Sequence, residues 1–314
     1  MASRKLEEQI DRIRQLRNAP SAAASRPILE KSLRDRANLV VAEAAKVIGD
    51  VHVVELIPEL LAAYARLFED PVKTDPKCWG KTSIVKALTV LDYCESPSYV
   101  RGASHVQMEP VWGGQEDAAA QLRSNCILAL PQCSDLRRNE VLRYLVDALA
   151  DSLDPVRLDA VRAIEQMNGD ESPLILRLKA RLGDRRPAVT GRVFDALLGL
   201  EPKPGLVFVS GFLKSNDVEV RDEAALAMGS SRQAQAVQNL IAAWNETIDH
   251  DFRSILLRAI SASREESALE FLLSLVKEGS PRHAGAALEA LAIHSDSPEI
   301  QQRVIEAKNE RAKE

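Results

Sequence analysis

The chain has 314 residues, of which 46% are hydrophobic and 28% are charged, and its formal net charge is −5. These proportions are typical of a folded globular protein and exclude disorder as a description of the whole chain. A general nucleic-acid binder needs a basic stripe, and the sequence contains none, so we do not expect a nucleic-acid partner. The sequence leaves open a local basic patch on one face of the folded chain.

The N-terminal residues and the small number of cysteines indicate where in the cell the protein resides. The first ten residues, Met-Ala-Ser-Arg-Lys-Leu-Glu-Glu-Gln-Ile, carry charges where a signal peptide needs an apolar run. No stretch approaches the length of about 18 apolar residues that a membrane span requires, so we expect no membrane association. Four cysteines are too few for a disulfide framework in a chain of this length. We therefore expect a soluble cytoplasmic protein.

The chain opens with one amphipathic helix. Within residues 4–18, Leu6, Ile10, Ile13 and Leu16 fall at helical spacing, and charged residues occupy the other face. This helix is expected to end before Pro20. We interpret residues 1–20 as a cap over the first repeat, because an open repeat stack would expose its core. A partner-binding helix is the alternative interpretation.

From there a pattern of small-apolar pairs recurs along the chain. The pairs are Ala87-Leu88, Ala129-Leu130, Ala163-Ile164, Ala196-Leu197, Ala227-Met228, Ala259-Ile260 and Ala290-Leu291. After a first step of 42 residues, the pairs follow one another at 31 to 34 residues. A period in this range, filled by two short helices, predicts a helical solenoid. The first helices of the repeats are predicted at 53–69, 138–150, 172–182, 204–213, 234–244 and 267–277.

One repeat carries a family resemblance. Asp154-Pro155-Val156-Arg157, continuing through Ala163-Ile164, resembles the HEAT-like repeats of the phycobilisome-lyase type. The match extends over most of the chain and is strongest from about 136 to 294. It implies an all-α fold, which we expect to be a right-handed α-solenoid of about eight HEAT-like helical hairpins forming a single domain over 1–314. It implies little about function, because such repeats serve as scaffolds, adaptors, chaperones and occasionally enzymes.

Aspartate and arginine recur near the helix starts of the repeats. The residues are Asp35, Asp75, Asp154, Asp217 and Asp251, with Arg157, Arg221 and Arg253. Recurrence at the repeat period is what stacking demands, so we interpret them as helix caps and ion pairs that link one repeat to the next. None of them is predicted to be catalytic.

The helical pattern breaks at 92–117. Helices are expected at about 75–91 and about 115–130, and a regular repeat would place its first helix between them. The segment instead contains Pro97, Gly102, Pro110, Gly113 and Gly114, with no sustained helical period. We predict an irregular aromatic loop that replaces one repeat helix. Long ordered loops both seal cores and bind ligands, so a structural plug and a binding site both remain open.

The binding interpretation rests on a cluster of polar and aromatic residues in and before this segment. They are Trp79, Lys81, Tyr93, Tyr99, Arg101, His105, Gln107, Glu109 and Trp112. Trp112 precedes Gly113-Gly114, where a backbone can approach a ligand closely. Our hypothesis is a peptide- or protein-binding pocket floored by Trp79 and Trp112.

No constellation for catalysis or metal binding is evident. Cys78, Cys94, His105 and Glu109 lack the spacing of a metal site, and no GxSxG motif is present. The repeated His-Glu pairs of HEAT-fold di-iron hydroxylases are also absent. We therefore assign no catalytic residue, no metal and no cofactor.

The preferred function is a non-enzymatic scaffold or adaptor that binds a protein or peptide on the concave face of the solenoid. The alternative is a lyase-like enzyme or cofactor-handling chaperone with a pocket under 92–117 that uses Lys81, His105 and Glu109. A scaffold's segment should lie open with exposed aromatic side chains. An enzyme pocket should be enclosed, with His105 and Glu109 within hydrogen-bonding reach of one point. The sequence leaves the oligomeric state open.

Overall fold

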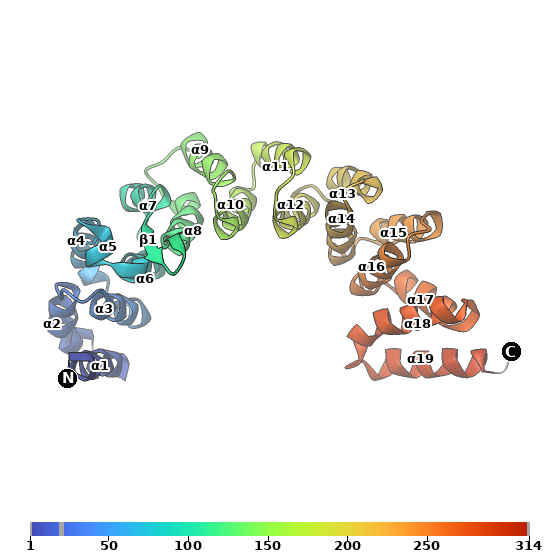
Figure 1. Ribbon diagram of the computed structural model, residues 1–314, viewed down its shortest axis with the longest axis horizontal. Coiled ribbons are helices and arrows are strands. Elements are labelled where there is room, and N and C mark those ends of the chain that lie inside the picture. Colours follow the sequence, from blue (N-terminus) through green and yellow to red (C-terminus); the bar gives the residue numbers. More distant parts are fainter. Residues whose placement is uncertain (1, 19–21, 313–314) are drawn as a thin grey trace. The chain divides into compact units, whose positions relative to one another are not determined.

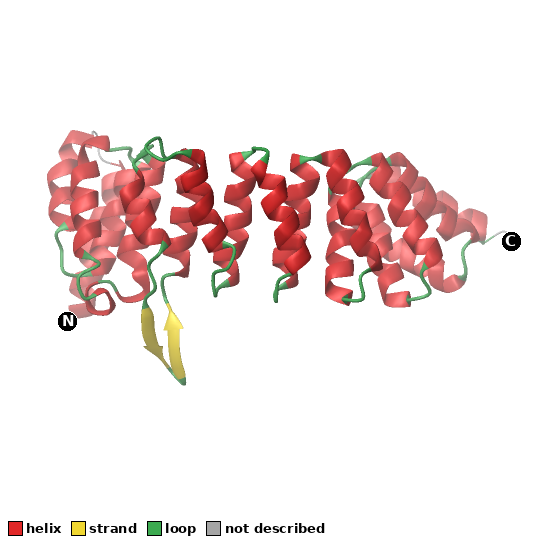
Figure 2. Cartoon of the chain, turned by 90° about the horizontal axis from the view of Figure 1, so that it is seen from above, coloured by secondary structure: helices red, strands yellow, loops and turns green. Residues whose placement is uncertain are grey.

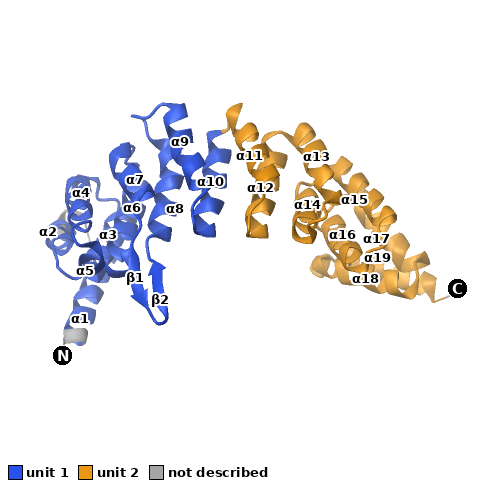
Figure 3. Ribbon diagram, turned by 45° about the horizontal axis from the view of Figure 1, so that its top comes forward, with its two compact units in different colours: residues 1–167 blue, residues 168–314 orange. Residues whose placement is uncertain are grey.

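The computed structural model describes residues 2–18 and 22–312. By contacts the chain divides into two compact units, Met1–Met167 (unit 1) and Asn168–Glu314 (unit 2), which Figure 3 colours separately. Each unit is described by itself. The single domain expected over 1–314 therefore stays a prediction.

Both units consist of paired helices, and the described residues form eight pairs, the number predicted. The first helices are α2 (Ala22–Leu33), α4 (Ile57–Arg66), α7 (Ser96–Ala103) and α9 (Arg138–Ala148) in unit 1, and α11 (Glu171–Leu182), α13 (Pro202–Ser210), α15 (Ala234–Glu246) and α17 (Glu266–Glu278) in unit 2. The second helices are α3 (Asn38–Asp50), α6 (Trp79–Val90), α8 (Ala120–Ala129), α10 (Asp154–Met167), α12 (Pro187–Leu200), α14 (Val218–Ser230), α16 (His250–Ala262) and α18 (Pro281–Leu291). The all-α repeat fold is thereby confirmed.

Other elements flank or join the pairs. They are α1 (Ala2–Gln15), α5 (Pro71–Thr74), α19 (Pro298–Arg311) and 3-10 turns at Leu16–Asn18, Val54–Leu56, Pro76–Cys78, Leu130–Gln132, Gly211–Lys214 and Ala292–His294. Helix α1 packs against α3 and buries Ile13. Residues 1, 19 and 20 of the expected N-terminal cap lie outside the described residues, and the capping role stays a prediction.

The helices of each unit form two layers. In unit 1 the second helices pack side by side in the order α3, α6, α8, α10, and in unit 2 in the order α12, α14, α16, α18. Figure 1 shows each first helix on the same side of its row. The core lies between the layers, and every predicted Ala-Leu, Ala-Ile and Ala-Met pair is buried there. No helix within 2–18 and 22–312 is both long and apolar enough to cross a membrane.

Several of the recurrent Asp and Arg residues cap helices and connect repeats as expected. The Asp217 carboxylate accepts hydrogen bonds from the backbone N–H groups of Glu219 and Val220 at the start of α14. From the same helix, the Arg221 guanidinium reaches Asp249 at 2.9 Å. The N-cap of α16 is Asp249 and not Asp251, because the cap residue must precede the first helical turn.

The prediction of an irregular loop over 92–117 is wrong in part. The first helix of this repeat is present as α7, which packs on α8 and buries Tyr99 and Gly102. The extra chain is a two-stranded antiparallel hairpin of β1 (Met108–Val111) and β2 (Gly114–Asp117), inserted between α7 and α8. Helix α7 has only eight residues, too few to display a helical period, and the hairpin delays the start of α8.

Close packing of neighbouring second helices yields a stability prediction. A Cβ at Gly229 in α14 would overlap the backbone carbonyl of Ala259 in α16. We expect Gly229→Ala to lower the free energy of unfolding by about 1–3 kcal/mol, the cost of overpacking. Gly285 in α18 has open space at its Cβ, so Gly285→Ala should be neutral or stabilising by up to about 1 kcal/mol. Chemical denaturation of both variants measures this. Equal changes in the free energy of unfolding for the two variants would contradict the close contact between α14 and α16.

Candidate functional site

The hairpin projects from the helices of unit 1 and carries a tryptophan at its tip. Figure 2 shows the two strands standing out beyond the helix ends. Val111 pairs with Gly114, so Trp112 and Gly113 form the two-residue turn. Gly113 has φ +92°, a conformation that a residue with a Cβ rarely adopts. Trp112 has a relative exposure of 104%, so its whole side chain faces solvent.

The base of the hairpin rests on the start of α6. The Asp75 carboxylate accepts hydrogen bonds from the backbone N–H groups of Gly80 at 2.7 Å and Lys81 at 2.9 Å, and so caps α6. It also accepts one from the Asn38 amide at 2.9 Å, which links it to α3. Lys77 and Cys78 have positive φ, which bends the chain sharply between Asp75 and α6.

A buried ammonium group connects this cap to the hairpin. Lys81 and Asp75 are both 0% exposed, and the Lys81 ammonium lies 3.1 Å from the Asp75 carboxylate. The ammonium also donates hydrogen bonds to the Leu67 carbonyl at 3.2 Å and to the Gln107 side-chain carbonyl at 2.9 Å. The three directions of the ammonium are thus all occupied, as a buried charge requires.

Gln107, at the root of the hairpin, collects most of the remaining polar side chains. Its side-chain oxygen is also within hydrogen-bond distance of the Cys78 thiol and of the His105 ring, both at 3.1 Å. Its amide nitrogen donates to the Glu109 carboxylate at 2.6 Å. Glu109 in turn accepts the backbone N–H of Lys77 at 2.6 Å. His105 and Glu109 therefore meet at the Gln107 side chain.

A second ion cluster holds the far side of the hairpin against α8. Arg123 is almost fully buried, lies 2.7 Å from Asp117 and makes two bonds of 2.8 and 3.0 Å to Asp151. Although burial raises the pKa of Asp117, hydrogen bonds from the backbone of Ala119 and Gln107 and from Arg123 outweigh it and lower that pKa. Both strands of the hairpin are therefore anchored.

Aromatic rings complete the base. The Arg101 guanidinium lies 4.0 Å from the centre of the Phe68 ring. The His105 ring contacts the same Phe68 ring edge-on, with 4.8 Å between the ring centres. Tyr99 is buried and donates its hydroxyl hydrogen bond to the Tyr93 carbonyl at 2.9 Å. These rings seal the core around α7, whereas the hairpin tip covers nothing.

The structure divides the predicted site into three parts. Lys81, His105, Gln107 and Glu109 form one polar network, in which Lys81 and Gln107 are buried. Tyr93, Tyr99 and Arg101 belong to the packing around α7. The predicted pocket floored by Trp79 and Trp112 is not formed. Trp79 instead lines a groove on the exposed faces of α3 and α6, and Trp112 is not among the residues that line it.

Sequence reasoning missed four residues that hold the hairpin: Phe68, Asp117, Arg123 and Asp151. It treated Asp75 only as a cap. A signal for the turn was present, because Gly113, which can adopt a positive φ, follows the apolar pair Val111-Trp112. The step of 42 residues between Ala87 and Ala129 also marks an insertion of about ten residues.

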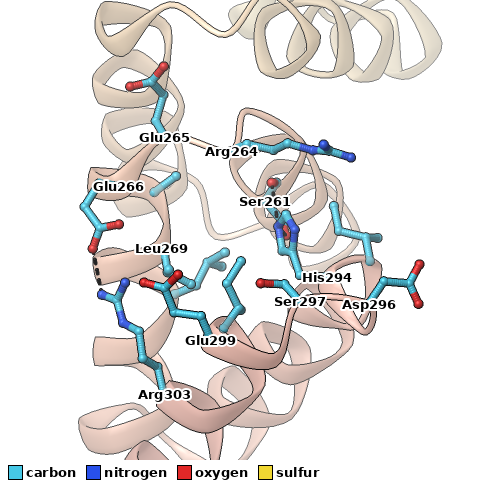
Figure 4. Close-up of a pocket in the computed structure, with 14 residues that line it drawn as sticks. Ser261, Arg264, Glu265, Glu266, Leu269, His294, Asp296, Ser297, Glu299 and Arg303 are labelled. Atoms are coloured by element: carbon cyan, nitrogen blue, oxygen red, sulfur yellow. Dashed lines mark hydrogen bonds and ion pairs between the residues drawn. The ribbon is translucent and has the colours of Figure 1, made fainter.

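Unit 2 contains a hollow of about 430 Å³ near its C-terminal end, drawn in Figure 4. Its rim mixes charges of both signs, and Arg303 pairs with Glu266 at 2.7 Å. His294 is engaged on its Nε2, which lies 3.0 Å from the Ser261 carbonyl and 3.1 Å from the Ser261 hydroxyl. The described part of the chain contains no group of three or more His, Cys, Asp or Glu residues placed to hold a metal ion. We see no catalytic arrangement in this hollow.

Comparison with known proteins gives a family match that agrees with the repeat fold. Residues 205–292 match the family of HEAT repeats. No curated protein matches the chain. Among solved structures, human deoxyhypusine hydroxylase in complex with glycerol is 18% identical, with a TM-score of 0.32 over 81% of this chain and 89% of that one. The complex of CpcE and CpcF of phycocyanin lyase from Nostoc sp. PCC7120 is 16% identical, with a TM-score of 0.35 over 91% and 93%. An engineered protein is 15% identical, with a TM-score of 0.37 over 96% and 87%.

The half-buried environment of His105 predicts a pH dependence of the stability. Burial lowers the pKa of His105 below its usual value near 6.5. As the pH falls below about 6.5, the unfolded chain therefore binds a proton that the folded chain resists, and stability decreases. We expect the free energy of unfolding to decrease between about pH 7 and pH 5, and to decrease less in His105→Gln. Denaturation curves at several pH values test this. Identical slopes for both proteins would show that His105 is not responsible.

Proposed function

We propose that this chain, whose residues 205–292 match the family of HEAT repeats, is a non-enzymatic scaffold or adaptor that binds a protein or peptide through unit 1, with the hairpin as its specificity element. The observation that carries the proposal is the exposure of Trp112 at the tip of a hairpin whose base is tied down by buried ionic contacts. Tryptophan is the residue type most enriched among interface hot spots.

The chemistry of the base supports display of the tip. A contact residue on a rigid support loses little conformational entropy on binding, which favours affinity. The Lys81 and Arg123 clusters supply that support from α6 and α8. Val111 adds exposed apolar surface next to Trp112, and Val106 and Met108 add more at the base of the hairpin. A cluster of large exposed apolar side chains on one projecting element is typical of a protein interface.

The alternative, an enzyme or cofactor-handling chaperone with a pocket under this segment, has no observation in its favour. Lys81, His105 and Glu109, the side chains expected to serve such a pocket, are all bonded to Gln107. The Gln107 side chain thereby fills the point at which these groups would have to meet a substrate.

Affinity purification tests the proposal. With tagged wild-type protein as bait, we expect saturable recovery of a protein partner, and loss of that recovery with Trp112→Ala. The substitution should change the free energy of unfolding by less than about 0.5 kcal/mol, because the side chain touches no core. Ile248→Ala removes an exposed apolar side chain from unit 2 and should capture the partner as wild type does. Equal recovery with Trp112→Ala and wild type would refute the role of the hairpin.

A further inference from the structure

Beside the hairpin, unit 1 has a groove of about 410 Å³ that runs across the exposed faces of α3 and α6. Its apolar side chains are Ile10 from α1, Leu39 and Ala42 from α3, and Trp79 from the first turn of α6. Trp79 is 46% exposed, which is high for a tryptophan at the start of a packed helix. The groove therefore offers apolar contact area to a ligand.

The charges along this groove are predominantly positive. Lys46, Lys77 and Lys86 line it, and within the described residues none of the three forms an ion pair. Lys77 places its ammonium 5.4 Å from the centre of the Trp79 ring, a cation–π contact that leaves the charge available to solvent. Three unpaired ammonium groups around one apolar floor create a positive local potential.

The one carboxylate of the groove is already neutralised. Glu43 lies 3.2 Å from both Arg14 and Arg17, and its side chain is largely covered. It therefore does not repel an incoming anion. The Arg14 side chain is half exposed at the same edge, but its guanidinium is shared between Glu43 and Asp11, each at a distance of 3.1 to 3.2 Å. The uncompensated positive charge of the groove therefore comes from the three lysines.

We propose that this groove binds an acidic peptide segment of the partner, with a large apolar side chain seated against Trp79 and carboxylates paired with Lys46, Lys77 and Lys86. This inference rests on the proposed function and names the chemistry of the partner. Opposite charges on the two sides of an interface give specificity and speed association, while the apolar contact supplies most of the affinity.

The same lysines could meet nucleic-acid phosphates, and the observations favour the peptide. A nucleic-acid binder tracks the phosphate backbone with a continuous basic stripe. Here the positive groups surround a floor made by Ile10, Leu39 and Ala42, which suits an aliphatic or aromatic side chain. A nucleic-acid ligand is therefore treated as an outcome of the test that overturns the proposal.

The test uses the full chain and a fluorescein-labelled peptide of Glu-Glu-Leu repeats, with binding followed by fluorescence anisotropy. We expect saturable binding that weakens with salt, and no binding of a Lys-Lys-Leu peptide of the same length. Lys46→Glu with Lys86→Glu should weaken binding by about tenfold or more. Trp79→Ala should also weaken it, because the apolar anchor is lost.

A matched double variant, Lys31→Glu with Lys203→Glu, changes the net charge equally on exposed residues away from the groove and should bind as wild type does. Equal weakening in both double variants would mean that only net charge matters, and would overturn the proposal. Unchanged peptide binding by Trp79→Ala would also overturn the proposal, as would tighter binding of a single-stranded oligonucleotide that competes with the peptide.

The failure of the groove proposal can be told apart from the failure of the scaffold function. If the groove variants bind the peptide as wild type does while Trp112→Ala still abolishes partner capture, the groove chemistry is wrong and the scaffold function stands. If the peptide binds as expected but Trp112→Ala captures the partner as well as wild type does, the groove chemistry stands and the role of the hairpin is wrong.

Discussion

The buried ammonium of Lys81 is the interaction on which the candidate site depends. It joins the cap of α6, the carbonyl of Leu67 after α4 and the root of the hairpin at Gln107. Removing one partner of a buried ion pair typically costs about 3–5 kcal/mol, because the other charge stays in a medium that solvates it poorly. The positions of the hairpin and of the first turn of α6, where Trp79 lies, are therefore coupled through one side chain.

This coupling places the two proposed binding features next to each other. The hairpin presents an exposed apolar tip, and the groove of Trp79 presents a cationic rim over an apolar floor. Glu109 belongs to both, because its carboxylate accepts from Gln107 in the network and from the backbone of Lys77 at the edge of the groove. Glu109 and Val111 lie on the same face of β1, since strand side chains alternate, so Val111 faces the side on which Lys77 lies. A partner that engages the tip is thus brought near the groove.

The repeat architecture could be predicted from the sequence because the small-apolar pairs recur at a nearly constant spacing of 31 to 34 residues after the first step. In each helix pair from α6 to α18, the small-apolar residues mark the buried C-terminal half of the second helix, with Leu130 just past the end of α8. The repeat that contains the inserted hairpin, formed by α7 and α8, could not be predicted in the same way. Helix α7 is short, and its buried Tyr99 and Gly102 are too few to show a helical face. The polar network was beyond prediction for a different reason. Gln107 is 26 residues from Lys81 in the sequence, and Asp151 is 28 residues from Arg123, and only the folded chain shows that these side chains meet.

The central claim is that the hairpin is held rigidly on its base by the Lys81 network, and amide hydrogen exchange tests it most directly. In the wild-type protein the backbone amides of Gln107, Ala118 and Ala119, which donate within the hairpin base, should exchange as slowly as those in the middle of α6. In Lys81→Met they should exchange much faster, while amides in α14 stay protected. Rapid exchange at the hairpin base in the wild-type protein, or exchange there that Lys81→Met leaves unchanged, would contradict the account.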